Sequence, residues 1–361
     1  MEALNLIVPQ TQNLSTLTLT TAPVISYAQP YQEDFFTTVR VLSFFWPGII
    51  FFGLCSNITN LVVFLKAGVK DNVTVLLLSL AISDVVFLML ITPSMCFLLI
   101  YASLPTFSWP FDPSILKSLM YWPAFTAYDL SAFISVSLGV TRCACVAMPL
   151  KFKFVFTKMR TIKWVIFLVV LAISLRLPVL TIHRISYRLD PKTNISSAYM
   201  LAVNREHMSR INDILNRSVV IYLAYGTMVT CVAILVFKLH QAARVRRACT
   251  GKFPQSASPD QASDETSNQE QLLSAKDVQV VKSVVLVCTI FIVLQLPFVL
   301  VSTIRLIAPE FDNFQRLVYL FGIFSQISRT CAYLNASLNI FIYYNYNSRY
   351  RSVFCSLLQW N

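Results

Sequence analysis

Long apolar stretches alternate with short polar segments along this chain, and the pattern predicts helices that cross a membrane. About 20 consecutive apolar residues are enough for one helix to span the hydrocarbon core. We expect seven spans, and they fall at residues 41–65, 73–101, 116–146, 162–183, 217–240, 278–304 and 317–344. The predicted fold class is therefore all-α, a seven-transmembrane helix bundle.

A shorter amphipathic stretch follows the last span. Residues 345–361 place Arg349 and Arg351 among apolar side chains, which predicts a C-terminal amphipathic helix lying on the membrane surface and a short tail. Cys355 in this stretch is a candidate for acylation. An unmodified, buried thiol is the alternative, and the sequence leaves both open.

Two polar segments complete the predicted organisation. Residues 1–40 are rich in Thr, Gln and Ser and are predicted to form an extracellular N-terminal tail. Residues 249–274 are low in apolar content, which predicts a flexible cytoplasmic loop within the helical domain 41–344. This loop is either a simple linker or a phosphorylated segment.

The basic residues predict the orientation of the chain. The net charge is +12, and the short loop from Lys151 to Lys163 is the clearest basic segment between spans. Because Lys and Arg collect on the cytoplasmic side, the N-terminus is expected outside and the C-terminus in the cytosol. The chain lacks a basic region interleaved with aromatic residues, so we expect no nucleic-acid partner.

Composition supports the membrane interpretation. Hydrophobic residues make up 56% of the chain and charged residues 13%, whereas a soluble domain carries about twice that charge. All nine cysteines fall in predicted spans or cytoplasmic segments, so no extracellular disulfide framework is expected. Three Asn-x-Ser sequences in predicted outer segments make Asn13, Asn194 and Asn216 glycosylation candidates.

Asp84 is an acidic residue within the apolar run LSLAISDVVFLML. A charge inside a membrane is costly and needs a partner. Asp84 is therefore either a structural carboxylate hydrogen-bonded to neighbouring helices or part of an ion or proton site.

Five motifs occur in order along the spans: GLCSNITNLVVF, LSLAISDVV, TRCACVAMPLKF, FIVLQLPF and LNASLNIFIYY. Together they resemble rhodopsin-like (class A) G-protein-coupled receptors, and within them the peptide-receptor-like and chemosensory seven-helix receptors of molluscs. The resemblance covers about residues 41–358. It implies a multi-pass plasma-membrane receptor, not an enzyme, whose partners are an extracellular ligand, a heterotrimeric G protein and the lipid bilayer.

The resemblance also assigns roles to residues of the cytoplasmic half. It implies that Arg142, at the end of the third span, moves between a resting contact and the G protein. Asp277 is expected either to pair with Arg142 and hold the helices closed or to remain solvated. The remaining switch residues implied in this way are Phe291, Pro297 and Tyr343.

The resemblance further implies a pocket for one sodium ion. Its ligands would be Asp84, Ser131, Asn335 and Asn339, all of which carry the oxygen atoms that hard cations prefer. A hydrogen-bond network without an ion is the alternative. No other cofactor is expected.

Several positions depart from the family pattern. Thr141 replaces the acid before the arginine, Gln295 replaces the tryptophan of the sixth span, and Lys117 replaces the cysteine that staples the third span to the outer loop. Because the loop also lacks its cysteine, the outer loop is expected to lose a restraint worth ~2–4 kcal/mol.

The candidate ligand-binding residues are Asp129, Arg329, Arg305, Phe125 and Tyr128. Their mixed charge favours an anionic or zwitterionic ligand, either a peptide or a small chemical cue. The alternative is that Asp129 simply pairs with Arg329, while other cations such as Arg176 and Arg305 extend to the headgroups.

Two other function classes fit the sequence less well. A channel or transporter is the main alternative, but the sequence shows neither a repeated pair of interrupted spans nor a ring of acids. An intramembrane enzyme is not supported either, because the three histidines lie near span ends or in loops.

Overall fold

The computed structural model describes most of the helical domain. The described residues are 31–103, 113–148, 152, 154–181, 183–189, 196–202, 211–250, 275–308, 310–312 and 315–358, and some side chains within these ranges are also outside the description. All structural statements below concern these residues.

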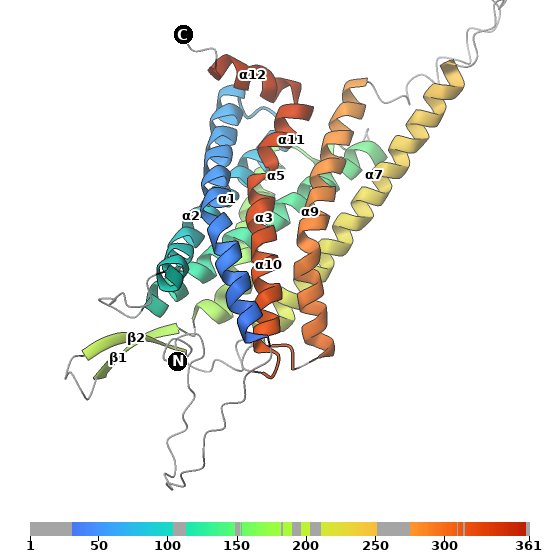
Figure 1. The fold of residues 1–361 in the computed structure, drawn as a ribbon. Helices are drawn as coiled ribbons and strands as arrows, with labels where there is room; N and C mark the ends of the chain where they lie inside the picture. Colours follow the sequence, from blue (N-terminus) through green and yellow to red (C-terminus); the bar gives the residue numbers. More distant parts are fainter. Residues whose placement is uncertain are drawn as a thin grey trace, which may run out of the picture.

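Long helices arranged as a bundle form the fold (Figure 1), which confirms the predicted all-α class. The bundle helices are α1 (Gln32–Ala67), α2 (Asn72–Ser103), α3 (Pro113–Ala147), α5 (Lys158–Leu180), α7 (Ile221–Thr250), α9 (Ala275–Ile307) and the pair α10 (Val318–Ser337) and α11 (Asn339–Tyr346). A π-helix, η2 (Asp213–Val220), leads directly into α7. The C-terminal helix α12 (Ser348–Leu358) lies across one end of the bundle (Figure 1).

Six of the described helices are long and apolar enough to cross a membrane: α1, α2, α3, α5, α7 with the end of η2, and α9. Their outward side chains are large and apolar, such as Phe44 on α1 and Val170 on α5, as expected for surfaces that contact lipid. Helix α10 falls below this level because it carries Gln326, Ser328 and Arg329. Gln326 and Ser328 are buried inside the bundle.

Several helix ends differ from the predicted ones. Helix α1 begins at Gln32, inside the segment predicted as tail (1–40), because Phe35 packs against α10. Helix α7 continues to Thr250 rather than ending at 240. The predicted last span 317–344 is two helices separated at Leu338.

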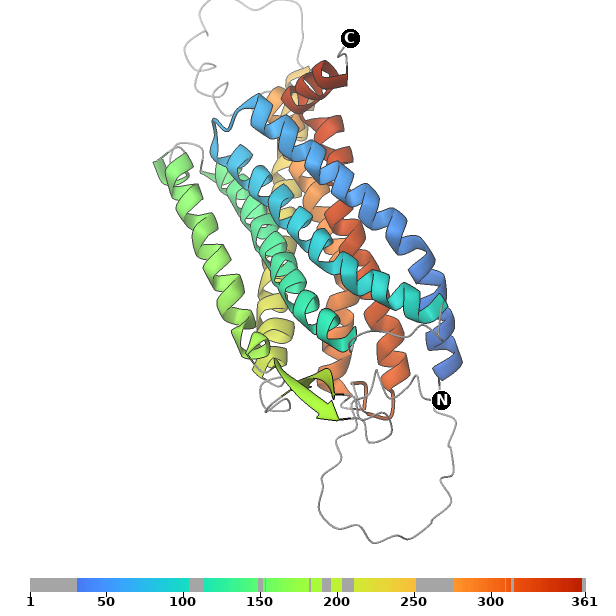
Figure 2. The same ribbon diagram turned by 90° about the vertical axis from the view of Figure 1, so that its left-hand side faces the viewer.

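An antiparallel hairpin was not predicted from the sequence. Strand β1 (His183–Leu189) pairs with β2 (Ser196–Ala202), with His183 opposite Ala202 and Leu189 opposite Ser196. The hairpin and the first residues of α1 lie at the same end of the bundle, opposite α12 (Figure 2).

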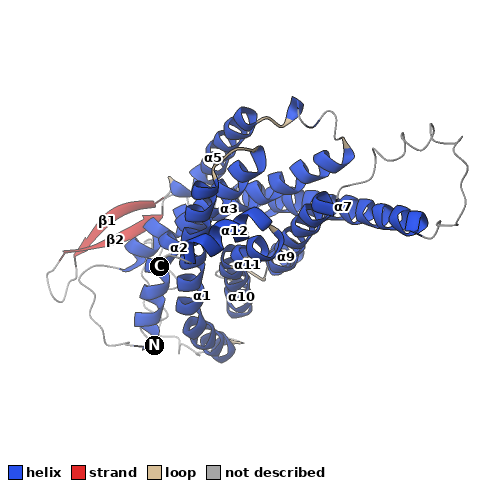
Figure 3. Ribbon diagram, turned by 90° about the horizontal axis from the view of Figure 1, so that it is seen from above, coloured by secondary structure: helices blue, strands red, loops and turns tan. Residues whose placement is uncertain are grey.

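Helix α3 occupies the centre of the bundle, where it contacts α2, α5, α7 and α9. Viewed from above, α7 extends farthest from this centre (Figure 3). Because α3 contacts these four helices, a site lined by α3 lies close to several helices at once.

Close packing holds α1 against α10. A methyl group at Gly53 would lie 2.7 Å from Leu88 and even closer to the hydroxyl of Ser337, and one at Gly322 would lie 2.6 Å from the ring of Phe35. Across the same interface, the indole Nε1 of Trp46 donates to the hydroxyl of Thr330 at 2.9 Å. The small residues let the two backbones approach, as is common between membrane helices.

Helix α12 is amphipathic, as predicted. Tyr350 is buried and donates from its hydroxyl to Oδ1 of Asn60 at 2.7 Å, while Arg349 and Arg351 are exposed. Burial raises the pKa of the Tyr350 hydroxyl. Cys355 is a half-buried free thiol, and its acylation stays a prediction.

Candidate functional site

Asp84 is the polar centre of the bundle and is completely buried. Ser131 on α3 donates from its hydroxyl to Oδ1 of Asp84 at 2.6 Å, and Asn339 on α11 donates from Nδ2 to Oδ2 at 3.0 Å. Asn335 is half-buried and makes no hydrogen bond to Asp84 in the described part of the chain. The structure therefore brings together three of the four predicted sodium ligands and ties α2 to α3 and α11.

The donor set at this centre fits a monovalent cation. It offers one carboxylate and one hydroxyl oxygen, and the Oδ1 of Asn339 would join them only after its amide, whose nitrogen now donates to Asp84, turns over. Hard cations take oxygen ligands. No group of three or more His, Cys, Asp or Glu side chains that could hold a metal ion occurs among the described residues, so a multivalent metal site of that kind is not supported there.

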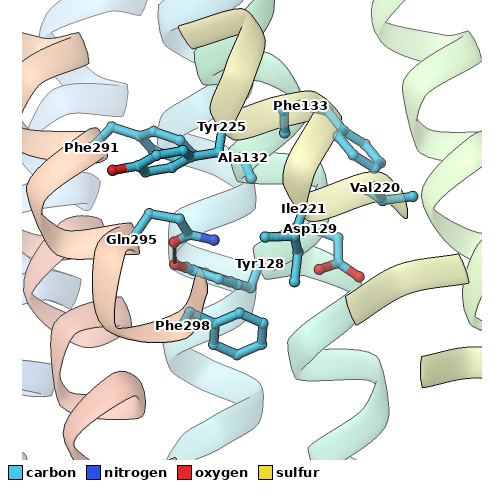
Figure 4. Close-up of a pocket in the computed structure, with 11 residues that line it drawn as sticks. Tyr128, Asp129, Ala132, Phe133, Val220, Ile221, Tyr225, Phe291, Gln295 and Phe298 are labelled. Atoms are coloured by element: carbon cyan, nitrogen blue, oxygen red, sulfur yellow. Dashed lines mark hydrogen bonds between the residues drawn. The ribbon is translucent and has the colours of Figure 1, made fainter. Parts of the chain in front are cut away.

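A small cavity lies between α3, η2 with α7, and α9 (Figure 4). Its volume is about 20 Å³, which is about the space that one water needs. Of the five ligand-binding candidates, Tyr128 and Asp129 line it, whereas Phe125, Arg305 and Arg329 do not. The lining residues are Tyr128, Asp129, Ala132, Phe133, Val220, Ile221, Ala224, Tyr225, Phe291, Gln295 and Phe298.

A hydrogen bond between two buried side chains crosses this cavity from α3 to α9. The hydroxyl of Tyr128 donates to Oε1 of Gln295 at 2.5 Å (Figure 4). This bond is a polar link between α3 and α9. Phe291, one turn away, is buried in a cluster with Ala132 and Cys288.

Asp129 pairs with Arg176 of α5, and this overturns the idea that it pairs with Arg329. The Nε of Arg176 lies 2.6 Å from Oδ2 of Asp129. The Arg176 side chain is only 6% exposed and that of Asp129 is 21% exposed. The prediction that Arg176 extends to the headgroups was wrong, because its carboxylate partner lies inside the bundle.

Arg305 is also paired, at the end of α9. It donates to the carboxylate of Asp312, and its guanidinium lies 5.3 Å from the centre of the Phe321 ring. The structure therefore places this ligand-binding candidate in a local cluster with Asp312 and Phe321 rather than at the cavity.

Arg329, on α10, has a different environment. Its guanidinium lies 5.3 Å from the centre of the Tyr121 ring, and it donates to Oε1 of Gln326 at 3.2 Å. Within the described residues, no carboxylate lies within salt-bridge distance of Arg329. The contacts that Arg329 makes within the described residues are therefore with neutral groups, the Tyr121 ring and the Gln326 amide.

A row of three aromatic rings on α3 joins Arg329 to the cavity. Tyr121, under the guanidinium, packs on Phe125 with ring centres 4.7 Å apart, and Phe125 packs on Tyr128 at 6.1 Å. Phe125 and Tyr128 are both buried. Phe125 thus connects Arg329 with the cavity without lining it.

Arg142 is half-buried near the end of α3. Before it, the hydroxyl of Thr141 donates to the carbonyl oxygen of Ser137 at 2.6 Å; after it, the thiol of Cys143 donates to the carbonyl oxygen of Cys231 on α7 at 3.2 Å. Asp277 lies in α9, but its side chain is outside the described ones. The Arg142–Asp277 pair stays a prediction.

The other two switch candidates lie within helices. Tyr343 on α11 is buried between the rings of Phe64, at 5.3 Å, and Tyr350, at 5.8 Å. Pro297 lies inside α9 two residues after Gln295. Because proline removes one backbone hydrogen bond of a helix, α9 has a natural bending point beside the cavity.

The glycosylation candidates are not placed by the structure. Asn13 and Asn194 lie outside the described residues, and Asn216 lies in η2 with its side chain outside the description. All three stay predictions.

The chain was compared with models of known protein families, and one of them matches. Residues 56–343 match the 7 transmembrane receptor (rhodopsin family) model. The chain belongs to the rhodopsin family of seven-transmembrane receptors. This rhodopsin-family receptor is therefore a multi-pass membrane protein that signals through G proteins, and it is not an enzyme.

The family assignment also decides between the alternatives. It sets aside the channel or transporter interpretation for this receptor. No curated protein matches the chain, so the narrower likeness to molluscan receptors stays a prediction. The sequence pointed to Arg176 and Gln295 but missed two pairings, Arg176 with Asp129 and Gln295 with Tyr128.

Proposed function

We propose that this receptor detects an extracellular ligand that carries an anionic group, and that binding rearranges the helices to expose Arg142 to a G protein. The N-terminal end of α1 and the hairpin lie outside the cell, and α12 lies in the cytosol. The observation that carries the proposal is the neutral surroundings of Arg329.

The charges of the outer half favour an anion. Arg176 and Arg305 each have a carboxylate partner, whereas the described neighbours of Arg329 are an amide and an aromatic ring. A half-buried cation in a membrane bundle is costly without a counter-charge. A carboxylate, sulfate or phosphate group would supply one through two parallel hydrogen bonds. An anionic ligand is favoured over a zwitterion because Asp129 is already neutralised.

The aromatic row gives a route for the signal. A ligand that draws Arg329 off Tyr121 changes the packing under Phe125 and Tyr128. The hydrogen bond between Tyr128 and Gln295 then breaks, and the cytoplasmic half of α9 moves away from α3 by bending at Pro297. The ligand selects this open arrangement by binding it more tightly than the closed one.

We also propose that one sodium ion occupies the centre around Asp84 in the resting state. Asp84, Ser131 and Asn339 would hold it, with Asn335 joining after a small side-chain movement. The ion would supply a counter-charge to Asp84 and favour the closed arrangement. Complete burial of the carboxylate supports this proposal.

Replacement of Arg329 tests the anionic ligand class. A panel of carboxylic acids and short acidic peptides is applied to wild type, Arg329→Gln and Arg329→Lys, with G-protein nucleotide exchange as readout. A charged hydrogen bond is worth about 1.5–3 kcal/mol, so Arg329→Gln should lose about 10- to 100-fold in potency, and Arg329→Lys less.

Arg305→Gln is the matched control, since it removes an outer arginine that already has a carboxylate partner. It should leave potency within about threefold. Equal potency of an anionic agonist at wild type and Arg329→Gln, with both at the cell surface, would refute the proposal.

A further inference from the structure

We infer that Arg176 determines which ligands the cavity accepts: by holding Asp129, it makes the cavity electrically neutral, so that the cavity takes a neutral hydrogen-bonding group such as a carboxamide and rejects amines. The inference rests on the proposed receptor function. It adds the chemistry of the ligand's inner end to the anionic group that Arg329 binds farther out.

The geometry separates the two partners of the ion pair. Asp129 lines the cavity, whereas Arg176 does not, and no residue of α5 lines it. Arg176 contacts Asp129 without itself lining the cavity: its Nε lies 2.6 Å from Oδ2 of Asp129, and its side chain is almost fully buried. Arg176 is thus a positioning residue, which acts on a ligand only through Asp129.

Electrostatics then determines the response to a cation. Asp129 is the only charged residue among the eleven that line the cavity. An ammonium group on Asp129 would lie within about 5 Å of the Arg176 guanidinium, where two like charges repel strongly. That repulsion offsets much of the attraction to the carboxylate, so an amine gains little from entering.

The hydrogen-bonding groups of the cavity suit a neutral partner. Gln295 uses Oε1 to accept from Tyr128, and its amide nitrogen points into the cavity, with the Asp129 carboxylate on the other side (Figure 4). The cavity therefore offers a donor, the amide nitrogen of Gln295, opposite an acceptor, the carboxylate of Asp129. A carboxamide provides the complementary acceptor and donor, and Phe291 and Phe298 supply apolar walls around it.

The cavity must widen for such a group, because its present volume holds about one water. Widening between α3 and α9 is the same movement that the signalling proposal requires. Binding of the ligand's inner end and opening of the bundle are then one event.

A purely structural role for the pair is the competing explanation. The pair ties α3 to α5 in a receptor that lacks the outer disulfide, and it would then affect stability without affecting ligand class. The two explanations differ in what happens to amines when Arg176 is removed.

The test measures binding of phenethylamine and of its neutral counterpart 3-phenylpropanamide to the full-length receptor in lipid nanodiscs. Wild type, Arg176→Gln and the neutral double variant Asp129→Asn/Arg176→Gln are compared. Arg176→Gln should bind phenethylamine at least about tenfold more tightly than wild type does. The double variant should lose that gain and keep the wild-type preference for the carboxamide.

Three results would overturn the inference. They are an Arg176→Gln receptor with no gain in amine binding, a gain that persists in the double variant, and a wild type that already prefers the amine. If Arg176→Gln does not fold, the double variant decides alone, because it buries no unpaired charge. A preference of the double variant for the amine would refute neutrality of the cavity as the cause of selectivity. A retained preference for the carboxamide would support it. Failure of the Arg329 experiment would refute the anionic outer group and leave this comparison unaffected.

Discussion

Individual polar residues form the proposed sites of this receptor, and their positions along the chain were easier to predict from the sequence than their partners. Asp84, Ser131 and Asn339 were expected together, and the structure confirms two hydrogen bonds to the carboxylate. The partner of Asp129 was missed. Spacing along a helix fixes which side chains share its face, but it does not fix the rotation of α5, which brings Arg176 to α3.

Sodium dependence tests the role of Asp84. Asp84→Asn removes the only carboxylate of the proposed ion site, so agonist potency should become independent of sodium, whereas sodium should lower the potency at wild type. Potency is measured in sodium buffer and in an N-methylglucamine buffer of equal ionic strength. Ser94→Ala, which changes a buried serine of the same helix, should keep the sodium effect. A sodium effect of wild-type size in Asp84→Asn would contradict the ion site.

The hydrogen bond between Tyr128 and Gln295 should hold the resting state. Its loss is worth about 0.5–1.5 kcal/mol, so Tyr128→Phe should raise basal nucleotide exchange about 2- to 10-fold. Gln295→Leu should have a similar effect, and the double variant should add little to either.

Tyr333→Phe is the control for this prediction. Tyr333 is also buried, but the one hydrogen bond that its hydroxyl makes within the described residues is a weak one to the sulfur of Met95, at 3.5 Å, so basal exchange should stay at the wild-type level. Additive effects of the Tyr128 and Gln295 changes would count against a shared interaction.

At the scale of elements, apolar runs located the spans but not their ends or breaks. The start of α1 at Gln32 depends on the contact of Phe35 with Gly322, which no local pattern reveals. Helix α10 carries inward polar residues that weaken its apolar signal, and it is not among the six described helices that are apolar enough to cross a membrane, although the sequence pattern predicted a span there. The β1–β2 hairpin depends on pairing across a loop that reads as irregular.

Close packing between α1 and α10 makes Gly53 sensitive to substitution. In Gly53→Ala, the added methyl group would press on Leu88 and Ser337, and overpacking of this kind costs about 1–3 kcal/mol. Thermal unfolding in detergent should show a clear drop in Tm. Gly48→Ala on the same helix meets nothing within 4 Å, so it should be neutral or slightly stabilising. Equal Tm values for the two variants would refute the close approach.

At the scale of the whole molecule, a series of contacts runs from Arg329 on α10 through α3 to α9. Arg329 is joined to the cavity by the ring row on α3, the cavity is crossed by the Tyr128–Gln295 bond, and α9 bends at Pro297 beside it. The same helix α3 ends near Arg142. On the proposed function, one central helix would contribute to ligand detection, to the closed state and to the G-protein surface.

Nucleotide exchange by Arg142→Ala tests this account most directly. Purified receptor in nanodiscs is mixed with a heterotrimeric G protein and an anionic agonist, and exchange and agonist binding are measured together. Arg349→Ala, at an exposed arginine of α12, serves as the control and should behave like wild type. The account predicts that Arg142→Ala binds agonist with wild-type affinity in the absence of G protein but loses exchange by at least about tenfold. Agonist-driven exchange at the wild-type rate in Arg142→Ala would contradict it.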